Sequence, residues 1–274
     1  MQDWIDTPPG RYLLRWEQDQ IDAAVANVFG YHALQLGLPA LDGLRANRMP
    51  SQWLASDCPQ DLAGAMPSAR SPRVASPRAI SLITEFSALP FPSSSLDLVV
   101  LPHTLEFCDD AHATLREVER VLVPEGRVVI TGFNPGSLWA MQQRRYHVYQ
   151  RLGLGRPFLP ETGEFLGFWR LRDWLQLLSL ELESHTFGCY RPGMRSASWL
   201  QRFEWMDRLG PRWWPIFGAG YVLVGVKRVR GMRLLGPAWK SRPSRLRKSV
   251  PMANYQPVAP GPSDTDCRKQ DECR

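Results

Sequence analysis

The chain has 274 residues, 44% of them hydrophobic, and a formal net charge of +6 at pH 7. This composition is typical of a globular protein and excludes a wholly disordered chain. The apolar run at residues 216–226 has about half of the roughly 20 residues that a membrane-spanning helix needs. The N-terminal sequence lacks the basic start and apolar stretch of a secretory signal. We therefore expect a cytoplasmic protein without a membrane span.

The cysteines and the charge distribution narrow the function classes further. Five cysteines, an odd number without CxxC spacing, predict neither a disulfide framework nor a zinc site. Between Arg208 and Ser263 the chain has no Asp or Glu, whereas Lys and Arg accumulate there. Residues 235–274 are rich in Pro, Ser, Arg and Lys and predict a disordered basic tail. Such a basic segment can bind nucleic acid or an anionic surface, or it can remain a solvated tail.

The first elements combine one helix with short apolar segments. Residues 11–28 place apolar side chains at helical intervals and predict an N-terminal helix. Residues 31–37 are short, apolar and closed by glycine, which predicts a first strand. Residues 52–56 predict a second strand, and the Pro, Ser, Ala and Arg of residues 59–78 predict an irregular connection.

A strand, helix, strand unit follows. Residues 79–85, 96–101 and 127–132 are brief, rich in branched aliphatic residues and bounded by turn formers, so each predicts a strand. Residues 96–101 are apolar on both alternating faces except at Asp97, as in a parallel strand covered by helices on both sides. Asp109 and Asp110 can cap a helix that ends at Pro124–Gly126.

The last elements complete an α/β pattern. Residues 170–178 predict an amphipathic helix, and residues 181–186 and 221–227 predict strands. Alternating strands and helices indicate an α/β sheet with helices on both faces. We assign residues 1–234 to one domain, with the helix at 11–28, a core at 30–135 and an aromatic lid region at 136–217, followed by the tail.

Ligands of open parallel sheets bind outside the carboxyl ends of the strands, where residues 35–39, Asp57, 85–86, 102–106 and 132–135 are expected. A nucleoside-like ligand could use their carboxylates, an apolar wall and a close backbone approach at glycine. Each of these candidate residues also has an interpretation without a ligand. Gly37 can simply end a strand, Glu85 can be a solvated charge, and Asp57 can belong to a surface loop.

A histidine at the end of a predicted strand is a further candidate site residue. His103 can donate, accept or carry a proton near neutral pH. Structural packing beside Pro102 explains it equally well, since spacing assigns it no acid, base or nucleophile partner. No GxSxG surrounds the serines at 93–95, so hydrolase chemistry has no support.

Three stretches together resemble a known family. They are Ala88–Val100 (ALPFPSSSLDLVV), His103–Glu106 (HTLE) and Leu115–Arg127 (LREVERVLVPEGR). They resemble class I S-adenosylmethionine-dependent methyltransferases of the methyltransferase-11 type, most strongly over residues 79–134. The Gly-Phe-Asn-Pro at 132–135 is similar to a bacterial subgroup. The resemblance implies a doubly wound, mostly parallel Rossmann-like sheet with an antiparallel C-terminal strand, and S-adenosyl-L-methionine as cofactor.

The resemblance also implies roles for individual residues in cofactor binding. Glu85 matches the carboxylate that meets the adenine amine, Phe86 would line the ring, and Asp57 lies about where the ribose-binding acid follows the second strand. Gln35 and Gly37 match the start of the glycine-rich loop. Gln35 replaces the family's acidic residue, and Pro39 and Leu41 stand at its second and third glycines, where proline removes a donor and a side chain blocks close approach.

The resemblance leads to a methyltransferase acting on an unidentified small-molecule or macromolecular acceptor. The family's usual substrate-selecting segment corresponds here to residues 134–169, and a second aromatic region at 199–217 could cover the cleft. Packing as a helical lid explains these aromatics as well. Two alternatives stay open: a catalytically silent relative used as a binding or regulatory scaffold, and a protein that associates with nucleic acid through its basic tail.

Overall fold

The computed structural model describes residues 2–57, 79–150, 159, 163–194 and 196–229. The helices lie at α1 (Gln2–Ile5), α2 (Pro8–Val25), α4 (Thr104–Phe107), α5 (Ala111–Val121), α6 (Leu138–Gln150), α7 (Phe168–Leu177), α8 (Ala197–Arg202) and α9 (Trp205–Trp213), with a 3-10 turn η1 (Pro215–Phe217). The strands are β1 (His32–Leu36), β2 (Ser51–Ser56), β3 (Leu82–Ile83), β4 (Leu96–Pro102), β5 (Leu122–Phe133), β6 (Leu180–Gly188) and β7 (Gly220–Lys227).

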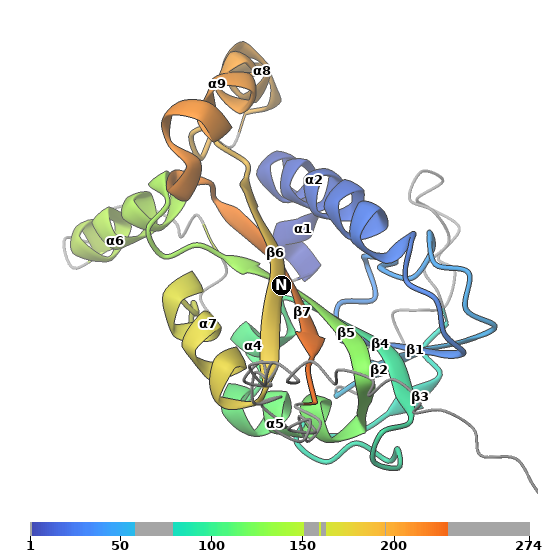
Figure 1. Ribbon diagram of the computed structural model, residues 1–274. Helices are drawn as coiled ribbons and strands as arrows, with labels where there is room; N and C mark the ends of the chain where they lie inside the picture. Colours follow the sequence, from blue (N-terminus) through green and yellow to red (C-terminus); the bar gives the residue numbers. More distant parts are fainter. Residues whose placement is uncertain (1, 58–78, 151–158, 160–162, 195, 230–274) are drawn as a thin grey trace, which may run out of the picture. The chain divides into compact units, whose positions relative to one another are not determined.

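The described strands form one mixed sheet in the order β3-β2-β1-β4-β5-β7-β6 (Figure 1). The pairs from β3 to β5 are parallel. Strand β7 pairs antiparallel with both β5 and β6. This arrangement confirms the predicted doubly wound, mostly parallel sheet with an antiparallel C-terminal strand. The reversal of chain order between β1 and β4 is the switch point at which a ligand site is expected.

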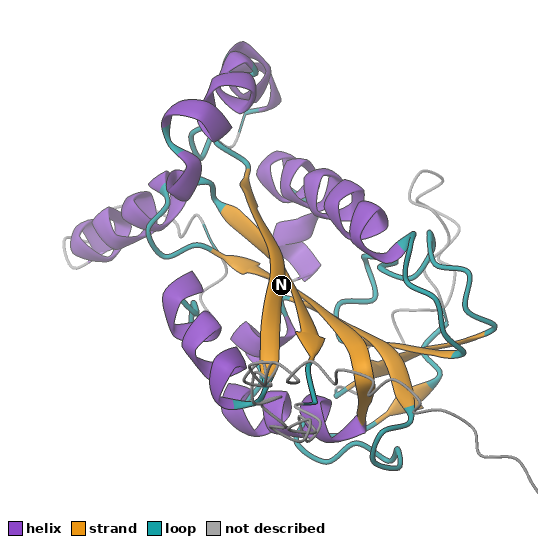
Figure 2. Ribbon diagram, viewed as in Figure 1, coloured by secondary structure: helices purple, strands orange, loops and turns teal. Residues whose placement is uncertain are grey.

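Helix α2 covers one face of the sheet (Figure 2). Thr7 accepts a hydrogen bond from the Gly10 N–H and caps the helix, and prolines at its first positions suit a helix start. Its buried stripe includes Ile21 and Val25, which pack in one cluster with side chains from β1, β4, β5 and β7. This packing holds the N-terminal helix against the centre of the sheet.

Helices α5 and α7 cover the opposite face. Leu115 and Val118 of α5 and Leu171 and Leu175 of α7 are fully buried in the larger core cluster. The Asp110 carboxylate accepts hydrogen bonds from the N–H groups of two residues in the first turn of α5, as its capping position predicts. Helices on both faces explain why β4 is almost entirely buried.

The connection between β1 and β2 differs from the usual strand, helix, strand unit. Residues 37–50 are described throughout and form turns without a helix. Leu41 and Leu44 from this connection are buried in the cluster of α2 and fill space against the sheet. The β1–β2 loop, as we call residues 37–50, therefore serves as a packing layer beside α2.

Element boundaries differ from the sequence-based ones in physically understandable ways. The N-terminal helix begins at Pro8 and ends at Val25, three residues earlier at each end than predicted. Strand β3 keeps only two of the seven predicted residues, because it pairs with β2 alone at the edge of the sheet. Within the region 136–217, α7 and β6 belong to the helix and sheet layers, whereas α6, α8 and α9 lie outside the sheet (Figure 1).

Three predictions lie outside the described residues: the basic tail at 235–274, the connection at 59–78 and the domain boundary at 234. Among the described helices, none is long and apolar enough to cross a membrane.

Candidate functional site

The carboxyl ends of β1, β3 and β4 bring together three residues from separate parts of the chain. Gly37 follows β1 with a φ of 73°, which places it in the left-handed region that favours glycine. A β-carbon on Gly37 would lie 3.4 Å from Oγ1 of Thr104 and 3.7 Å from Cζ of Phe86. Thr104 in turn donates a hydrogen bond to the Leu36 carbonyl. The predicted residues Gly37 and Phe86 are therefore neighbours at the switch point.

Gln35 organises the β1–β2 loop from inside the core. Its side chain is 1% exposed. The Nε2 group donates to the carbonyls of Gly37, Leu38 and Leu41 at 3.2, 3.2 and 2.7 Å. The Oε1 atom accepts from the Gly43 N–H at 2.8 Å. The amide side chain therefore uses its donors and an acceptor on its own loop, where a carboxylate could not donate to the carbonyls.

The other departures from a glycine-rich loop have structural roles too. Leu41 turns its side chain into the core and is 2% exposed. Pro39 is only half-buried and removes one backbone N–H that a bound anion could use. The loop thus stabilises itself through Gln35 and Leu41 and offers one glycine at the strand end, Gly37.

The two predicted carboxylates stand on exposed strand ends. Asp57 directly follows β2 and is exposed. Glu85 lies two residues after β3, is exposed, and accepts a hydrogen bond from Ser87. Next to it, Phe86 is 5% exposed and packs in the larger core cluster. Adjacent residues therefore offer a solvent-facing carboxylate and a buried ring at the same edge.

His103 is part of a buried cluster of three ionisable side chains. Its Nδ1 atom lies 2.7 Å from Oε2 of Glu106, and its Nε2 atom lies 2.8 Å from Oε1 of Glu17 on α2. The three side chains are at most 2% exposed. Glu106 also accepts a hydrogen bond from the Phe133 N–H at the end of β5. We call Glu17, His103 and Glu106 the buried triad.

The triad pairs one histidine with two carboxyl groups, and one carboxyl oxygen has no hydrogen-bond partner among the described residues. Burial alone would lower the pKa of His103, but the attraction of Glu17 and Glu106 raises that pKa to about 10. Burial raises the pKa of Glu106 against the lowering effect of His103. The Oε2 atom of Glu17 is buried and has no hydrogen-bond partner among the described residues. A buried acceptor without a donor is costly and calls for an explanation.

Aromatic side chains cover the triad. The Phe133 ring lies 4.4 Å from the His103 ring, between centroids, and also contacts the rings of Trp4 and Phe165 at 5.4 Å each. Trp139 of α6 belongs to the same small cluster and donates through Nε1 to the Arg191 carbonyl at 2.7 Å. The N-terminal helices and the start of the lid region thus meet over the ends of β4 and β5.

The Gly-Phe-Asn-Pro segment at 132–135 forms a tightly packed corner. A β-carbon on Gly132 would lie 2.6 Å from the Tyr221 hydroxyl and 3.0 Å from Oε1 of Glu106, so a larger residue would collide there. Asn134 donates through Nδ2 to the carbonyls of Ile216 and Gly218. This corner fixes the end of β5 beside the triad.

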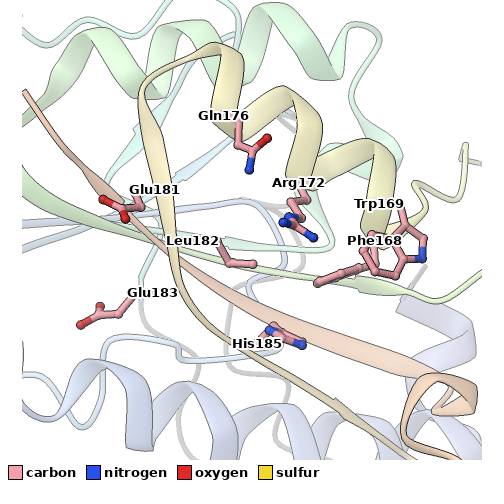
Figure 3. Close-up of a pocket in the computed structure, with 8 residues that line it drawn as sticks. All are labelled: Phe168, Trp169, Arg172, Gln176, Glu181, Leu182, Glu183 and His185. Atoms are coloured by element: carbon pink, nitrogen blue, oxygen red, sulfur yellow. The ribbon is translucent and has the colours of Figure 1, made fainter.

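A separate cavity of about 500 Å³ lies away from this edge, between α7 and the outer side of β6 (Figure 3). Its lining includes Trp169, Arg172 and His185. The Arg172 guanidinium lies 5.7 Å from the centre of the Trp169 ring. None of the predicted cofactor residues lines this cavity.

Sequence reasoning found His103 but missed its two partners. Glu17 falls between Leu13 and Ile21 at helical spacing, so it is a charged residue on the buried stripe of an amphipathic helix. This charged residue within an apolar stripe is the sequence signal that could have identified Glu17 as part of a buried site. Glu106 follows His103 by three residues, the spacing that places two side chains on one helix face.

Comparisons with known proteins agree with the fold. A family model described as a methyltransferase domain matches residues 50–130. The YafS protein of Escherichia coli is 29% identical over 180 residues, 65% of each chain. A malonyl-[acyl-carrier protein] O-methyltransferase of Halorhodospira halophila is 37% identical over 69 residues, 25% of this chain and 23% of its own. The matched segments thus span less than two thirds of these curated relatives.

Solved structures share the same architecture. A chain in the complex between the Haloferax volcanii Trm112 methyltransferase activator and a methyltransferase is 15% identical, with a TM-score of 0.52, and the match covers 84% of this chain and 98% of that one. A methyltransferase from Archaeoglobus fulgidus is 13% identical, with a TM-score of 0.51, over 78% and 94%. The fold is therefore that of class I methyltransferases, and residues 50–130 match the methyltransferase-domain model.

Proposed function

We propose that the protein is an S-adenosylmethionine-dependent methyltransferase whose cofactor binds at the carboxyl ends of β1 to β4. The observation that carries this proposal is the meeting of Gly37, Phe86 and Thr104 at the switch point of a methyltransferase sheet. A glycine with positive φ permits close backbone approach, and an aromatic ring beside it offers an apolar wall. The methyl acceptor is a small molecule or a macromolecule.

The residues fit the adenosine part of the cofactor. Asp57 and Glu85 are exposed carboxylates at neighbouring strand ends and can accept hydrogen bonds from ribose hydroxyls and the adenine amine. Phe86 would line the adenine ring. The β1–β2 loop does not fit the methionine part in the family's manner, because Gln35 and Leu41 are used within the loop itself.

When bound, the cofactor supplies a methyl group already activated by a sulfonium, so the protein needs little covalent machinery. The residues of the chain then have to orient the acceptor in line and take up its proton. The buried triad lies beside this site at the ends of β4 and β5, and the Oε2 atom of Glu17 has no hydrogen-bond partner among the described residues. His103 holds the other oxygen of Glu17 and is itself fixed by Glu106.

Titration calorimetry of the full chain with S-adenosylmethionine and with S-adenosylhomocysteine tests the proposal. We expect binding of both ligands, a rise in melting temperature, and at least about tenfold weaker binding in Glu85→Ala, since a lost hydrogen bond to a charged group costs about 1.5–3 kcal/mol. Glu181→Ala on the exposed side of β6 is the matched control and should bind as the parent does. Absence of heat and of thermal stabilisation would leave the silent scaffold as the better account.

A further inference from the structure

A group of large apolar side chains is exposed on α9 and the turn that follows it. We call this group the α9 face; its exposed fractions are Trp205 49%, Leu209 41%, Trp213 69%, Trp214 44%, Ile216 52% and Phe217 48%. Trp205, Leu209 and Trp213 are four residues apart and therefore form one stripe along the helix. Figure 1 shows α8 and α9 beyond the end of β6, outside the sheet layers.

The inner side of α9 explains why its apolar stripe points outward. Asp207 accepts hydrogen bonds from the Tyr12 hydroxyl and, at 2.7 Å, from Nε of Arg191. Gly210 lies so close to Tyr190 that a β-carbon there would be 2.2 Å from the ring. Asp207 and Gly210 therefore face the protein, and the apolar stripe lies on the outside of the helix.

The turn after α9 is held as firmly as the helix. Asn134 donates to the carbonyls of Ile216 and Gly218, and the Tyr190 hydroxyl donates to the Pro215 carbonyl at 3.0 Å. These contacts fix the backbone of η1 from beneath and leave its apolar side chains outside. The α9 face is thus a preformed surface. Its apolar side chains are exposed because contacts with the rest of the protein fix the opposite side of α9 and the backbone of η1.

The charges around the α9 face are predominantly positive. Arg202, Arg208 and Arg212 are exposed on α8 and α9, and the acidic neighbour on the outside is Glu204. Asp207 is committed to inward contacts. From Arg208 to Val229, the last described residue, the sequence has no Asp or Glu.

We propose that the α9 face binds the surface of an anionic lipid bilayer. Tryptophan is favoured at the boundary between lipid headgroups and acyl chains, because its ring is apolar and its N–H is polar. Leu209 and Ile216 lower the free energy of binding by leaving water for the apolar part of the bilayer. The arginines are attracted to the negative headgroups. This combination of insertion and charge attraction defines a peripheral membrane contact, and it does not involve a spanning segment.

A second copy of the chain suits this face less well. In a two-fold symmetric contact each partner would present the same arginines to the other, and like charges at close range oppose association. Single-stranded nucleic acid also matches positive charge and stacking rings, but it provides no apolar phase for the aliphatic side chains of the face. An anionic bilayer complements both the positive charge and the exposed apolar area of the α9 face.

Vesicle flotation of the full chain tests this inference. We expect the protein to float with vesicles of phosphatidylcholine mixed with phosphatidylglycerol, to float much less with phosphatidylcholine alone, and to bind less tightly as salt is raised. The double variant Trp205→Gln and Trp213→Gln should lower the partition coefficient at least about tenfold, as expected when inserted apolar area is lost. Circular dichroism melting checks that the variants remain folded.

Trp169→Gln is the matched control, because Trp169 is 60% exposed on α7 and lies outside the α9 face. It should float like the parent, and Arg208→Gln with Arg212→Gln should weaken binding only to the anionic vesicles. The inference would be overturned by no flotation, by equal flotation of all variants, or by a dimer in sedimentation equilibrium that Trp213→Gln dissociates. Binding to a single-stranded oligonucleotide without binding to vesicles would overturn it too.

Discussion

The Nε2 atom of His103 lies 2.8 Å from Oε1 of Glu17, and this contact joins two residues 86 positions apart in the chain. It connects the N-terminal helix with the end of β4 inside the protein, where both side chains are at most 1% exposed. Because the third member, Glu106, reaches the backbone of β5, one buried group links a helix and two strands.

Replacing Glu17 by Gln should lower the free energy of unfolding by about 1–3 kcal/mol, because the variant weakens a buried charge-assisted hydrogen bond to His103. Urea unfolding measures the change. Asp22→Asn on the same helix is the control, since its ion pair with Arg45 is partly exposed and should contribute at most about 1 kcal/mol. Equal losses in the two variants would contradict the assigned strength of the buried contact.

Stability should fall as the pH rises from about 6.5 to about 10. The pKa of His103 is raised from 6.5 to about 10 in the folded protein, so its contribution is fully present below pH 6.5 and is lost as the pH approaches 10. The pH dependence of urea unfolding tests this prediction. His103→Gln should flatten the profile across that window, and an unchanged slope in the variant would assign the loss to other groups.

Gln35→Glu should destabilise the protein by about 1–3 kcal/mol, although it restores the acidic residue that the family carries there. The new carboxylate would face the three carbonyl oxygens that the Nε2 group now satisfies, and these buried acceptors would lose their donor. Gln176→Glu on the exposed side of α7 is the control and should change stability by less than about 0.5 kcal/mol. Thermal and urea unfolding compare the two. A stability equal to that of the parent would show that the loop does not depend on the Gln35 amide.

Asp97→Ala should lower the free energy of unfolding by about 1.5–3 kcal/mol. The Oδ2 atom of Asp97 accepts hydrogen bonds from the N–H groups of Tyr31 and His32, at 2.8 and 2.9 Å, and so holds the start of β1 against β4. Asp97→Asn retains an acceptor oxygen and should cost less. If both variants lose the same stability in urea, the hydrogen bonds are not the source of the effect.

The sequence predicts those features whose causes are local. Residues 96–101 form a buried strand because branched aliphatic side chains occupy both of its faces, and Asp110 caps α5 through contacts two and three residues away. The resemblance correctly implied the mixed sheet. The cofactor roles of Asp57 and Glu85 stay predictions, for which the structure supplies positions at the strand ends.

Features that depend on distant contacts could not be predicted in the same way. The loss of a helix after β1 follows from how Gln35 and Leu41 fit beneath α2, and neither residue alone forbids a helix. The outward stripe of α9 depends on Asp207 reaching Tyr12, 195 residues away along the chain. A helical period identifies which residues share a face, but only the tertiary partner decides which face is buried.

The strand order has a consequence for synthesis of the chain. Strand β6 is at one end of the sheet and pairs with β7, which lies between it and β5. The ribosome completes β6 before it begins β7. Strand β6 can therefore pair with the sheet only after β7 has been synthesised. Until then one edge of β5 is open, and a nascent chain stalled between residues 189 and 219 would expose this edge and the unpaired strand β6 to chaperones and to aggregation.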